Sequence, residues 1–548
     1  MQGSTFGDTP ARIPVDVRRF ADMKPLANAY AYDFASVAPF FAGDPSASDS
    51  WASTIARIQA QGGDRTPIAA VIAAQQQRRQ APARAVETAG RLTDPRSVAI
   101  LTGQQAGLFG GPLYTLLKSL TTLKLAEQVS RDFNVPVVPI FWVDAEDHDW
   151  DEVRSCTVFD AELAPQTVSL PPNPTHTGTV AAIRLDQSVS ATLDDLQRVL
   201  PATEFTPSLL ADLRLFYAPG VGMADAFSRW LERVLGDRGL VVYDASDPAA
   251  KPLAASVFTR ELSTPGQTAQ LAGRAGADLA ARGYHSQVHT QDDGLALFHL
   301  EGGRHLIRQQ NGYFVAGDKR YAPADLVTAA GNQPSTFSPN VLLRPIVQDT
   351  LFPTVCYVAG PSELAYLAQL RQVYEHFGVA MPLVFPRASA TLIDTAAHRF
   401  LAKYRLPLEA LQAQDESALN ELLKQQMPAE IEQAFEAATQ SIDAAMARVV
   451  DAMPLLDPTL EGAARSTLGR MTHDLQTLRA KTVQAAKRRD DTLRRQFIRT
   501  RALTYPNAHP QQRLIGFVSF LNQYGPALLE RLEDELPLDI GHHWIVVV

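Results

Sequence analysis

The chain has 548 residues, 46% of them hydrophobic and 20% charged, which is typical of globular proteins. This length exceeds what one hydrophobic core serves, so we expect two or three domains. A net charge of −9 argues against nucleic acid as a partner, and no apolar run approaches the roughly 18 residues that span a membrane. The two cysteines are far apart and the first residues do not form a signal peptide, which indicates a reducing, cytoplasmic location.

The first 95 residues have a mostly helical pattern, with a long helix expected over residues 69–89 and broken at Pro82. A strand–helix–strand unit follows. Residues 98–101 and 137–143 are apolar runs typical of buried strands, and the spacer between them has leucines at helical spacing. In such a βαβ unit the loops after both strands leave the same edge of the sheet, where open α/β sheets bind ligands. We therefore expect the two loops to face one crevice.

The loop after the first strand is rich in glycine. Gly103, Gly107, Gly110 and Gly111 would allow a backbone to approach a ligand closely, and a helix beginning near Pro112 would direct free N–H groups at an anion. The spacing matches neither the GxGxxG fingerprint nor a P-loop, and the same glycines could serve packing alone. The paired amides that end the strand favour contact with substrate. Residues expected to face the crevice are Gln104, Gln105 and, in the helix, Lys118.

The loop after the second strand gathers carboxylates around His148. These are Asp144, Glu146, Asp147, Asp149, Asp151 and Glu152. Their mutual repulsion would cost stability unless a cation lies among them. A metal ion, an ammonium group of a substrate, or an Arg or Lys of the protein could supply that charge. Carboxylates suit Mg²⁺, whereas a zinc site usually has more His or Cys. The alternative is an acidic surface turn held by salt bridges.

Further strands are expected later in the chain. Residues 239–244 predict a buried strand, and residues 284–330 alternate short β-like runs with turns, which indicates a β-rich insertion. Strands are also expected over residues 341–345, 354–361 and 382–389.

Two arginines stand at the ends of these later strands. Arg344 and Arg387 could each bind a carboxylate or phosphate through paired hydrogen bonds, and a structural salt bridge is the alternative for each. A helix over residues 362–377, capped by Ser362, is expected to follow the strand at 354–361.

From about Leu408 the composition changes to one rich in Ala, Gln, Glu and Arg. Two heptad seams predict an antiparallel coiled-coil hairpin within residues 401–505, and residues 506–548 are expected to return to the core as helices and a strand. The first seam consists of Ile431, Phe435, Ala438, Ile442, Ala445 and Val449. The second consists of Leu468, Met471, Leu475, Leu478, Thr482 and Ala485. Two seams expose more apolar surface than one hairpin needs, so we expect a homodimer. The basic run over residues 481–501 is expected to pair with the acidic helix, with binding of a phosphate or nucleotide as the alternative.

These segments resemble the cysteine-adding enzymes of bacillithiol biosynthesis. The resemblance rests on residues 102–118, 141–149, 341–345, 360–363 and 386–389, with further matches at 512–513 and 522–525. One departure is Leu117, where family members often have His. The resemblance implies an α/β fold: a Rossmann-like parallel-sheet core over residues 1–400, similar to class I aminoacyl-tRNA synthetases and nucleotidyltransferases. It also implies connecting-peptide insertions, at about 160–240 and 284–330, and an α-helical antiparallel coiled coil that pairs two subunits.

The resemblance further implies that cysteine is joined to glucosaminyl malate through an amide with the glucosamine amine. A carboxylate and an ammonium group do not condense spontaneously in water, so activation of the carboxyl is expected, most simply by ATP, with Mg²⁺ as a candidate ion. The implied catalytic residues are Glu146, Asp147, His148 and Lys118. The implied substrate-binding residues are Gln104, Gln105, Gly107, Tyr114, Asp149, Arg344, Arg387 and Ser389, and the implied nucleotide-binding residues are Gly110 and Gly111.

Two other functions fit parts of the same pattern. The carboxylates of the acidic loop could hold Mg²⁺ in a metal-dependent nucleotidyltransferase. A non-enzymatic coiled-coil interaction protein, binding nucleic acid through its basic run, is the second, although the acidic net charge counts against it.

Overall fold

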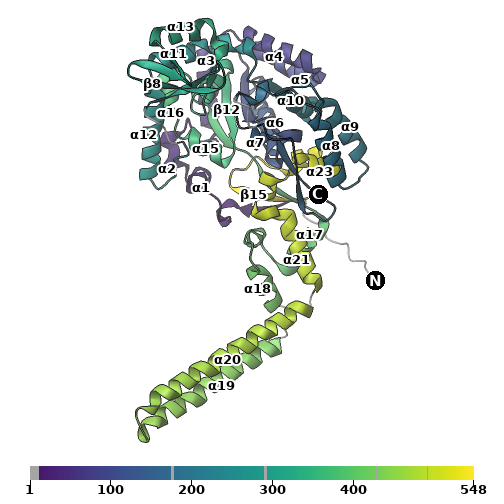
Figure 1. The fold of residues 1–548 in the computed structure, drawn as a ribbon, viewed down its shortest axis with the longest axis vertical. Helices are drawn as coiled ribbons and strands as arrows, with labels where there is room; N and C mark the ends of the chain where they lie inside the picture. Colours follow the sequence, from purple (N-terminus) through teal and green to yellow (C-terminus); the bar gives the residue numbers. More distant parts are fainter. Residues whose placement is uncertain (1–11, 174–177, 289–292, 426–428, 490) are drawn as a thin grey trace. The chain divides into compact units, whose positions relative to one another are not determined.

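The computed structural model describes residues 12–173, 178–288, 293–425, 429–489 and 491–548. The chain forms two compact units, Met1–Leu392 with Gln511–Val548, and Ile393–Pro510 (Figure 1). The sequence placed the boundaries of the second unit at residues 400 and 505, within eight residues of those observed. No helix in the described part of the chain is long and apolar enough to cross a membrane.

The first unit is built around a five-stranded sheet in which every pair of neighbouring strands is parallel. In spatial order its strands are β13 (Leu383–Pro386), β12 (Thr354–Ala359), β2 (Val98–Gln104), β3 (Val137–Val143) and β6 (Val241–Asp244). The chain adds strands outward from β2 in one direction, then returns to add β12 and β13 on the other side. The order therefore reverses between β2 and β12, which is the topological switch point of a Rossmann-like fold.

Both faces of this sheet are covered, as the unbroken apolar runs predict. Side chains alternate between two cores: Ala99 and Leu101 of β2 belong to one, and Val98 and Ile100 to the other. The helix α6 (Leu113–Phe133) contacts β2 and β3, and it ends at Asn134 in the left-handed conformation. The predicted βαβ unit is confirmed.

Two smaller sheets are inserted into this frame. An antiparallel sheet has the order β10 (Lys319–Tyr321), β9 (Tyr313–Ala316), β8 (His305–Gln310), β7 (Gly294–His299) and β11 (Phe337–Pro339). Four of these strands lie within the insertion predicted at residues 284–330. The hairpin β4 (Ser155–Phe159) and β5 (Pro165–Ser169) opens the other inserted region, which continues as α8 (Ser188–Val199), α9 (Thr206–Phe216) and α10 (Met223–Leu235).

The last residues of the chain return to this unit. Helices α22 (Gln511–Leu514), α23 (Phe517–Tyr524) and α24 (Ala527–Glu535) precede β15 (His542–Val547). Strand β15 lies between β1 (Arg12–Asp16) and β14 (Ser389–Ile393) in a three-stranded sheet. The N-terminal and C-terminal parts of the chain are thereby joined through one strand.

Two predictions about the segment before the coiled coil were wrong. Residues 341–345 are not a strand, because the Asn340 side chain accepts hydrogen bonds from the N–H groups of Leu342 and Leu343 and starts a helix, α14 (Arg344–Leu351). The helix expected over residues 362–377 is divided into α15 (Pro361–Leu367) and α16 (Arg371–Phe377). Its N-cap is Gly360 rather than Ser362, and the Glu363 carboxylate accepts from the Gly360 N–H at 2.8 Å.

The second unit contains the predicted hairpin. Its helices are α17 (Thr395–Tyr404), α18 (Ser417–Gln425), α19 (Ala429–Ala452), α20 (Leu460–Arg489) and α21 (Asp491–Thr504), and α19 and α20 pair along their length (Figure 1). Near the end of α19 the half-buried residues are Met446 and Val450. The predicted seam placed Ala445 and Val449 there instead, and both are exposed.

The predicted basic run falls partly outside the described residues, since nothing is described of the side chains at 486–490. Its later members pair within the second unit: Arg494 lies 3.4 Å from Glu416, and Arg499 pairs with Asp394. Both pairs have a structural role, but their acidic partners lie outside α19, the acidic helix with which the run was expected to pair.

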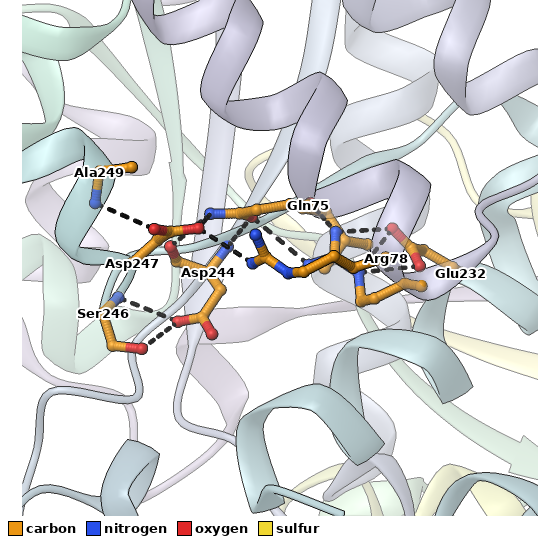
Figure 2. Close-up of polar contacts among 9 residues, drawn as sticks. Gln75, Arg78, Glu232, Asp244, Ser246, Asp247 and Ala249 are labelled. Atoms are coloured by element: carbon orange, nitrogen blue, oxygen red, sulfur yellow. Dashed lines mark hydrogen bonds and ion pairs between the residues drawn. The ribbon is translucent and has the colours of Figure 1, made fainter.

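A buried ion pair connects helices α4 and α10 to strand β6. Arg79, the last residue of α4 (Thr66–Arg79), binds Glu232 of α10 at 2.7 Å and also donates to the backbone oxygen of Val242. Figure 2 shows Glu232 together with Gln75 and Arg78 of α4. Both side chains are 2% exposed. Loss of one partner would leave a buried charge without compensation, which costs about 3–5 kcal/mol.

We therefore expect Arg79→Leu to lower the midpoint of thermal unfolding strongly. Arg84→Leu is the control, because Arg84 and Glu87 form an exposed pair whose loss costs under about 1 kcal/mol. The double variant Arg79→Leu, Glu232→Leu should regain part of the loss. Equal midpoints for Arg79→Leu and the control would contradict this account.

A buried histidine joins β15 to β14. Both ring nitrogens of His543 are 2.8 Å from hydroxyls, those of Ser389 and Thr391. Burial, assisted by the positive charge of Arg387, lowers the pKa of His543 from 6.5 to about 3. The native state therefore binds this proton less readily than the unfolded chain does, and its stability is highest above pH 6.5.

As the pH falls from 6.5 towards 3, this one group should reduce the free energy of unfolding by roughly 1.4 kcal/mol per pH unit. His543→Gln keeps polar contacts but does not titrate, so its stability should depend less steeply on pH over this range. Denaturant unfolding at pH 6.5, 5.5 and 4.5 measures the slopes, with exposed His509→Gln as the control. A slope unchanged in His543→Gln would show that this histidine titrates normally.

Candidate active site

A cavity of about 510 Å³ lies at the carboxyl ends of β2, β3 and β12, where the strand order reverses. The core contributes residues from both predicted loops, the antiparallel insertion contributes Phe298 and Arg304, and the C-terminal segment contributes Arg513. The predicted residues that line it are Gln104, Gln105, Tyr114, Lys118, Glu146, Asp147, Arg344 and Arg387. The two loops do share one crevice.

Lys118 is fixed at the switch point by a buried ion pair. Its ammonium group lies 2.5 Å from Glu363 of α15 and donates to the backbone oxygen of Gly103 at 2.6 Å. Burial lowers the pKa of Lys118, and the carboxylate of Glu363 opposes that shift. Burial alone would raise the pKa of Glu363, but Lys118 and the hydrogen bonds of Gly360 and Tyr357 hold it below its usual value. Each of the two groups therefore favours the charged form of the other.

The acidic loop is compensated by cations of the protein itself. Glu146 forms a buried ion pair with Lys251 of α11 (Lys251–Ser263), and Asp144 lies 3.9 Å from Arg344. Burial raises the pKa of Glu146 above its usual value, although Lys251 opposes this. The sequence left open whether a metal ion, a substrate ammonium group or a protein Arg or Lys balances these carboxylates. For Glu146 and Asp144 the structure shows a Lys and an Arg of the protein.

The remaining carboxylates of the loop have different roles. Asp147 accepts from the Gln105 amide at 2.6 Å, and the pKa of Asp147 is lowered because this bond and the His148 N–H outweigh its burial. Asp149 caps the short helix α7 (Trp150–Val153) by accepting from Glu152 N–H, so it does not face the cavity. Within the described residues no group of three or more His, Cys, Asp or Glu side chains could hold a metal ion.

His148 lies beside the cavity rather than in its wall. Its side chain is 66% exposed, and Nδ1 is 3.1 Å from Asp147 and 3.2 Å from the guanidinium of Arg304. Arg304 reaches this position from the turn between β7 and β8, with its guanidinium 3.6 Å from the ring centre of Phe298. The insertion thus brings a cation over the acidic loop.

Positive charge gathers at the opposite side of the cavity. The guanidinium of Arg387 is buried and donates to Gln512 at 2.7 Å and to the backbone oxygen of Ala388 at 2.8 Å. Burial, together with the positive charge of Arg513, lowers the pKa of Arg387 to about 10, so it remains protonated. In the described part of the chain neither Arg387 nor Arg513 has a carboxylate within ion-pair distance. This side of the cavity is suited to an anion.

Arg344 occupies a different position from the one expected. It is the first residue of α14 rather than the end of a strand, and it donates to the Tyr366 hydroxyl at 2.9 Å and to Gln348 at 3.0 Å. Its charge nevertheless enters the cavity between the acidic loop and α15.

The glycine loop serves packing, contrary to its expected role in binding a nucleotide. Gly110 has φ +98°, and a Cβ atom there would lie 2.3 Å from the ring of Phe517. The backbone oxygen of Gly111 accepts from Phe517 N–H, and Gly107 lies against Gly111. None of these three glycines lines the cavity, whereas Gly103, the fourth glycine of the predicted loop, does.

Two further expectations differ from the structure. The Leu113 N–H at the start of α6 donates to the backbone oxygen of Ile515, so that end of the helix does not direct all its free N–H groups at a ligand. Ser389 bonds His543 and Gln512 and lies outside the cavity wall.

Four charged residues outside the two predicted loops line or contact the cavity and were not predicted as site residues: Lys251, Arg304, Glu363 and Arg513. Glu363 and Arg513 belong to segments that carried the resemblance, so a signal for them existed. Lys251 and Arg304 stand in segments whose local pattern gives no indication of a site, and only the fold brings them to the acidic loop.

Two family models match the chain. Bacillithiol biosynthesis BshC, N-terminal Rossmann-like domain, matches residues 13–388, and Bacillithiol biosynthesis BshC, C-terminal coiled-coil domain, matches residues 390–548. Three similar proteins each bear the name "Putative cysteine ligase BshC". The protein of Salinibacter ruber is 33% identical to this chain, and the match covers 95% of both chains. The protein of Symbiobacterium thermophilum is 34% identical over 94% of this chain and 95% of its own length. The protein of Chlorobaculum tepidum is 35% identical over 81% of both chains. The chain therefore belongs to the BshC family of bacillithiol biosynthesis.

Proposed function

We propose that this chain is a ligase that joins the carboxyl group of L-cysteine to the amine of glucosaminyl malate and so forms bacillithiol. The observation that carries the proposal is the pair of guanidinium groups, Arg387 and Arg513, that lack a carboxylate partner within the described residues. They face a cavity whose other side holds Glu146 and Asp147. A substrate with carboxylates at one end and an amine at the other matches this separation of charge.

The roles of the side chains follow from their surroundings. Arg387 and Arg513 would bind the malate carboxylates, and Gln105 with Asp147 would orient the amine. An amine must lose a proton before it attacks, and a carboxylate whose pKa is raised by burial is a better base than an exposed one. Glu146 is such a carboxylate, and its partner Lys251 would stabilise the charge that Glu146 carries between turnovers.

Activation of the cysteine carboxyl is proposed to use ATP, which would supply a good leaving group, with Mg²⁺ as its counter-ion. Because Gly110 and Gly111 pack against Phe517, the phosphates would be held by side chains of the cavity rather than by that loop. The further cations in the described cavity wall are Lys118, Arg304 and Arg344. The proposed location is the cytoplasm, where the free thiols of Cys156 and Cys356 would remain reduced.

The ligase is tested by following thiol product from cysteine, ATP and glucosaminyl malate. Loss of charged hydrogen bonds worth roughly 1.5–3 kcal/mol should raise the KM for glucosaminyl malate about 10- to 100-fold in Arg387→Met. Glu146→Gln should lower kcat by roughly 10²- to 10⁴-fold, as expected for a missing base. Arg371→Met, at an exposed position outside the cavity, is the control. No product from the unaltered protein, or an unchanged KM in Arg387→Met, would refute the proposal.

We also propose that two copies pair through the hairpin of α19 and α20. Val449, Met471 and Leu478 remain 38%, 39% and 54% exposed along the hairpin, although each belongs to a predicted seam. A second hairpin would bury this stripe.

Light scattering after size-exclusion chromatography should therefore give the mass of a dimer. Met471→Gln with Leu478→Gln should shift the mass towards the monomer, because burial of polar amides without partners opposes association. Leu215→Gln, at an exposed position of the other unit, should leave the dimer intact. A monomeric unaltered protein would exclude this arrangement.

A further inference from the structure

The guanidinium of Arg387 is held at the cavity wall by an amide. Its Nη1 donates to Oε1 of Gln512 at 2.7 Å and to the backbone oxygen of Ala388 at 2.8 Å. Among the described residues Nε and Nη2 have no hydrogen-bond partner, and the side chain lines the cavity. Gln512 therefore fixes one edge of the guanidinium and leaves free the edge that binds a carboxylate or phosphate through two parallel hydrogen bonds.

The orientation of the Gln512 amide follows from its partners. Oε1 meets two donors, Arg387 and the N–H of Ala390 at 3.3 Å. Nε2 donates to the hydroxyl of Ser389 at 2.8 Å, which leaves the proton of that hydroxyl for Nδ1 of His543, 2.8 Å away. The Gln512 side chain is buried, so water cannot replace these partners. The amide is therefore held in one orientation.

Gln512 holds Arg387 without neutralising it. The amide carries no charge, and Glu363, the carboxylate that acts on Arg387 through space, forms its own ion pair with Lys118. A buried cation without a carboxylate partner costs stability. A carboxylate in place of the amide would relieve that cost, but it would also occupy the charge that an anionic ligand needs.

We propose that Gln512 is a positioning residue that fixes Arg387 and keeps its charge available to an anionic group of the ligand. This inference deepens the proposed function, on which it rests, because there Arg387 binds a carboxylate. Carboxylates and phosphates both offer two oxygens to the free edge of a guanidinium, and the experiment below distinguishes these two sources.

The surroundings of Gln512 can accommodate a carboxylate, so its charge can be tested in a folded protein. In Gln512→Glu both oxygens would accept, one from Arg387 and the other from the hydroxyl of Ser389. His543 would then donate to Ser389 through Nδ1 and accept at Nε2 from the hydroxyl of Thr391, which is 2.8 Å away. The histidine stays neutral in either tautomer, and no buried group loses its partner.

Three variants separate holding the guanidinium from leaving its charge free. Gln512→Glu adds a counter-charge, whereas Gln512→Met removes the hydrogen bonds and adds no charge. Gln523→Glu, at an exposed position of α23 outside the cavity, is the matched control. Isothermal titration calorimetry of the full-length protein measures the binding of L-malate and, separately, of inorganic phosphate. Thermal unfolding without ligand measures stability.

Affinity and stability should rank the two Gln512 variants in opposite orders. Gln512→Glu should bind the anion roughly 10-fold or more weakly than the unaltered protein, and more weakly than Gln512→Met. Its midpoint of unfolding should nevertheless be at or above that of the unaltered protein, whereas that of Gln512→Met should be lower. The control should bind as the unaltered protein does. The same order in both measurements, an unchanged affinity in Gln512→Glu, or no binding of either anion would overturn the inference.

The two anions also separate this inference from the ligase proposal. Binding of phosphate alone, weakened in Gln512→Glu, would retain the role of Gln512 and refute the assignment of Arg387 to the malate carboxylates. In an active ligase, Gln512→Glu should raise the KM for the substrate that carries the bound anion, glucosaminyl malate or ATP, roughly 10-fold or more. The KM for cysteine should not change. An active ligase whose KM values are all unchanged in Gln512→Glu would overturn the role of Gln512 alone.

Discussion

The buried ion pair between Lys118 and Glu363 is the contact on which the site depends. Lys118 stands on the helix that follows β2, and Glu363 stands on the helix that follows β12, so the pair spans the point at which the strand order reverses. A buried charge is tolerated only when it is paired and hydrogen-bonded. The pair therefore connects the two helices, and both of its members line the cavity of the candidate site.

A second constraint is the separation of charge across that cavity. Carboxylates of the acidic loop are matched by Lys251, Arg304 and Arg344, whereas Arg387 and Arg513 have no such match in the described residues. The site is therefore neutralised at one end and cationic at the other.

The strands and helices around the site were predictable because their signals are local. The apolar runs of β2 and β3, the helical spacing of α6 and the two seams of the hairpin each appear within a few turns of sequence. One failure was local in origin and the other was not. The Asn340 side chain holds a turn before α14 where apolar residues suggested a strand, whereas Gly110 packs against Phe517, which stands some four hundred residues later. Periodicity carries no information about which distant residue a turn will pack against.

The sequence by itself determined the βαβ unit, the hairpin and the concentration of carboxylates after β3, because periodicity and composition are properties of neighbouring residues. Only the tertiary structure decided which charges meet. Lys251 reaches Glu146 across 105 residues, and Arg387 is held by Gln512 across 125, so neither contact has a sequence spacing that could reveal it. The tertiary structure also decided the role of the glycine loop. Its sequence suggested phosphate binding, but the space beside Gly110 is filled by the ring of Phe517, so the loop packs against the C-terminal segment.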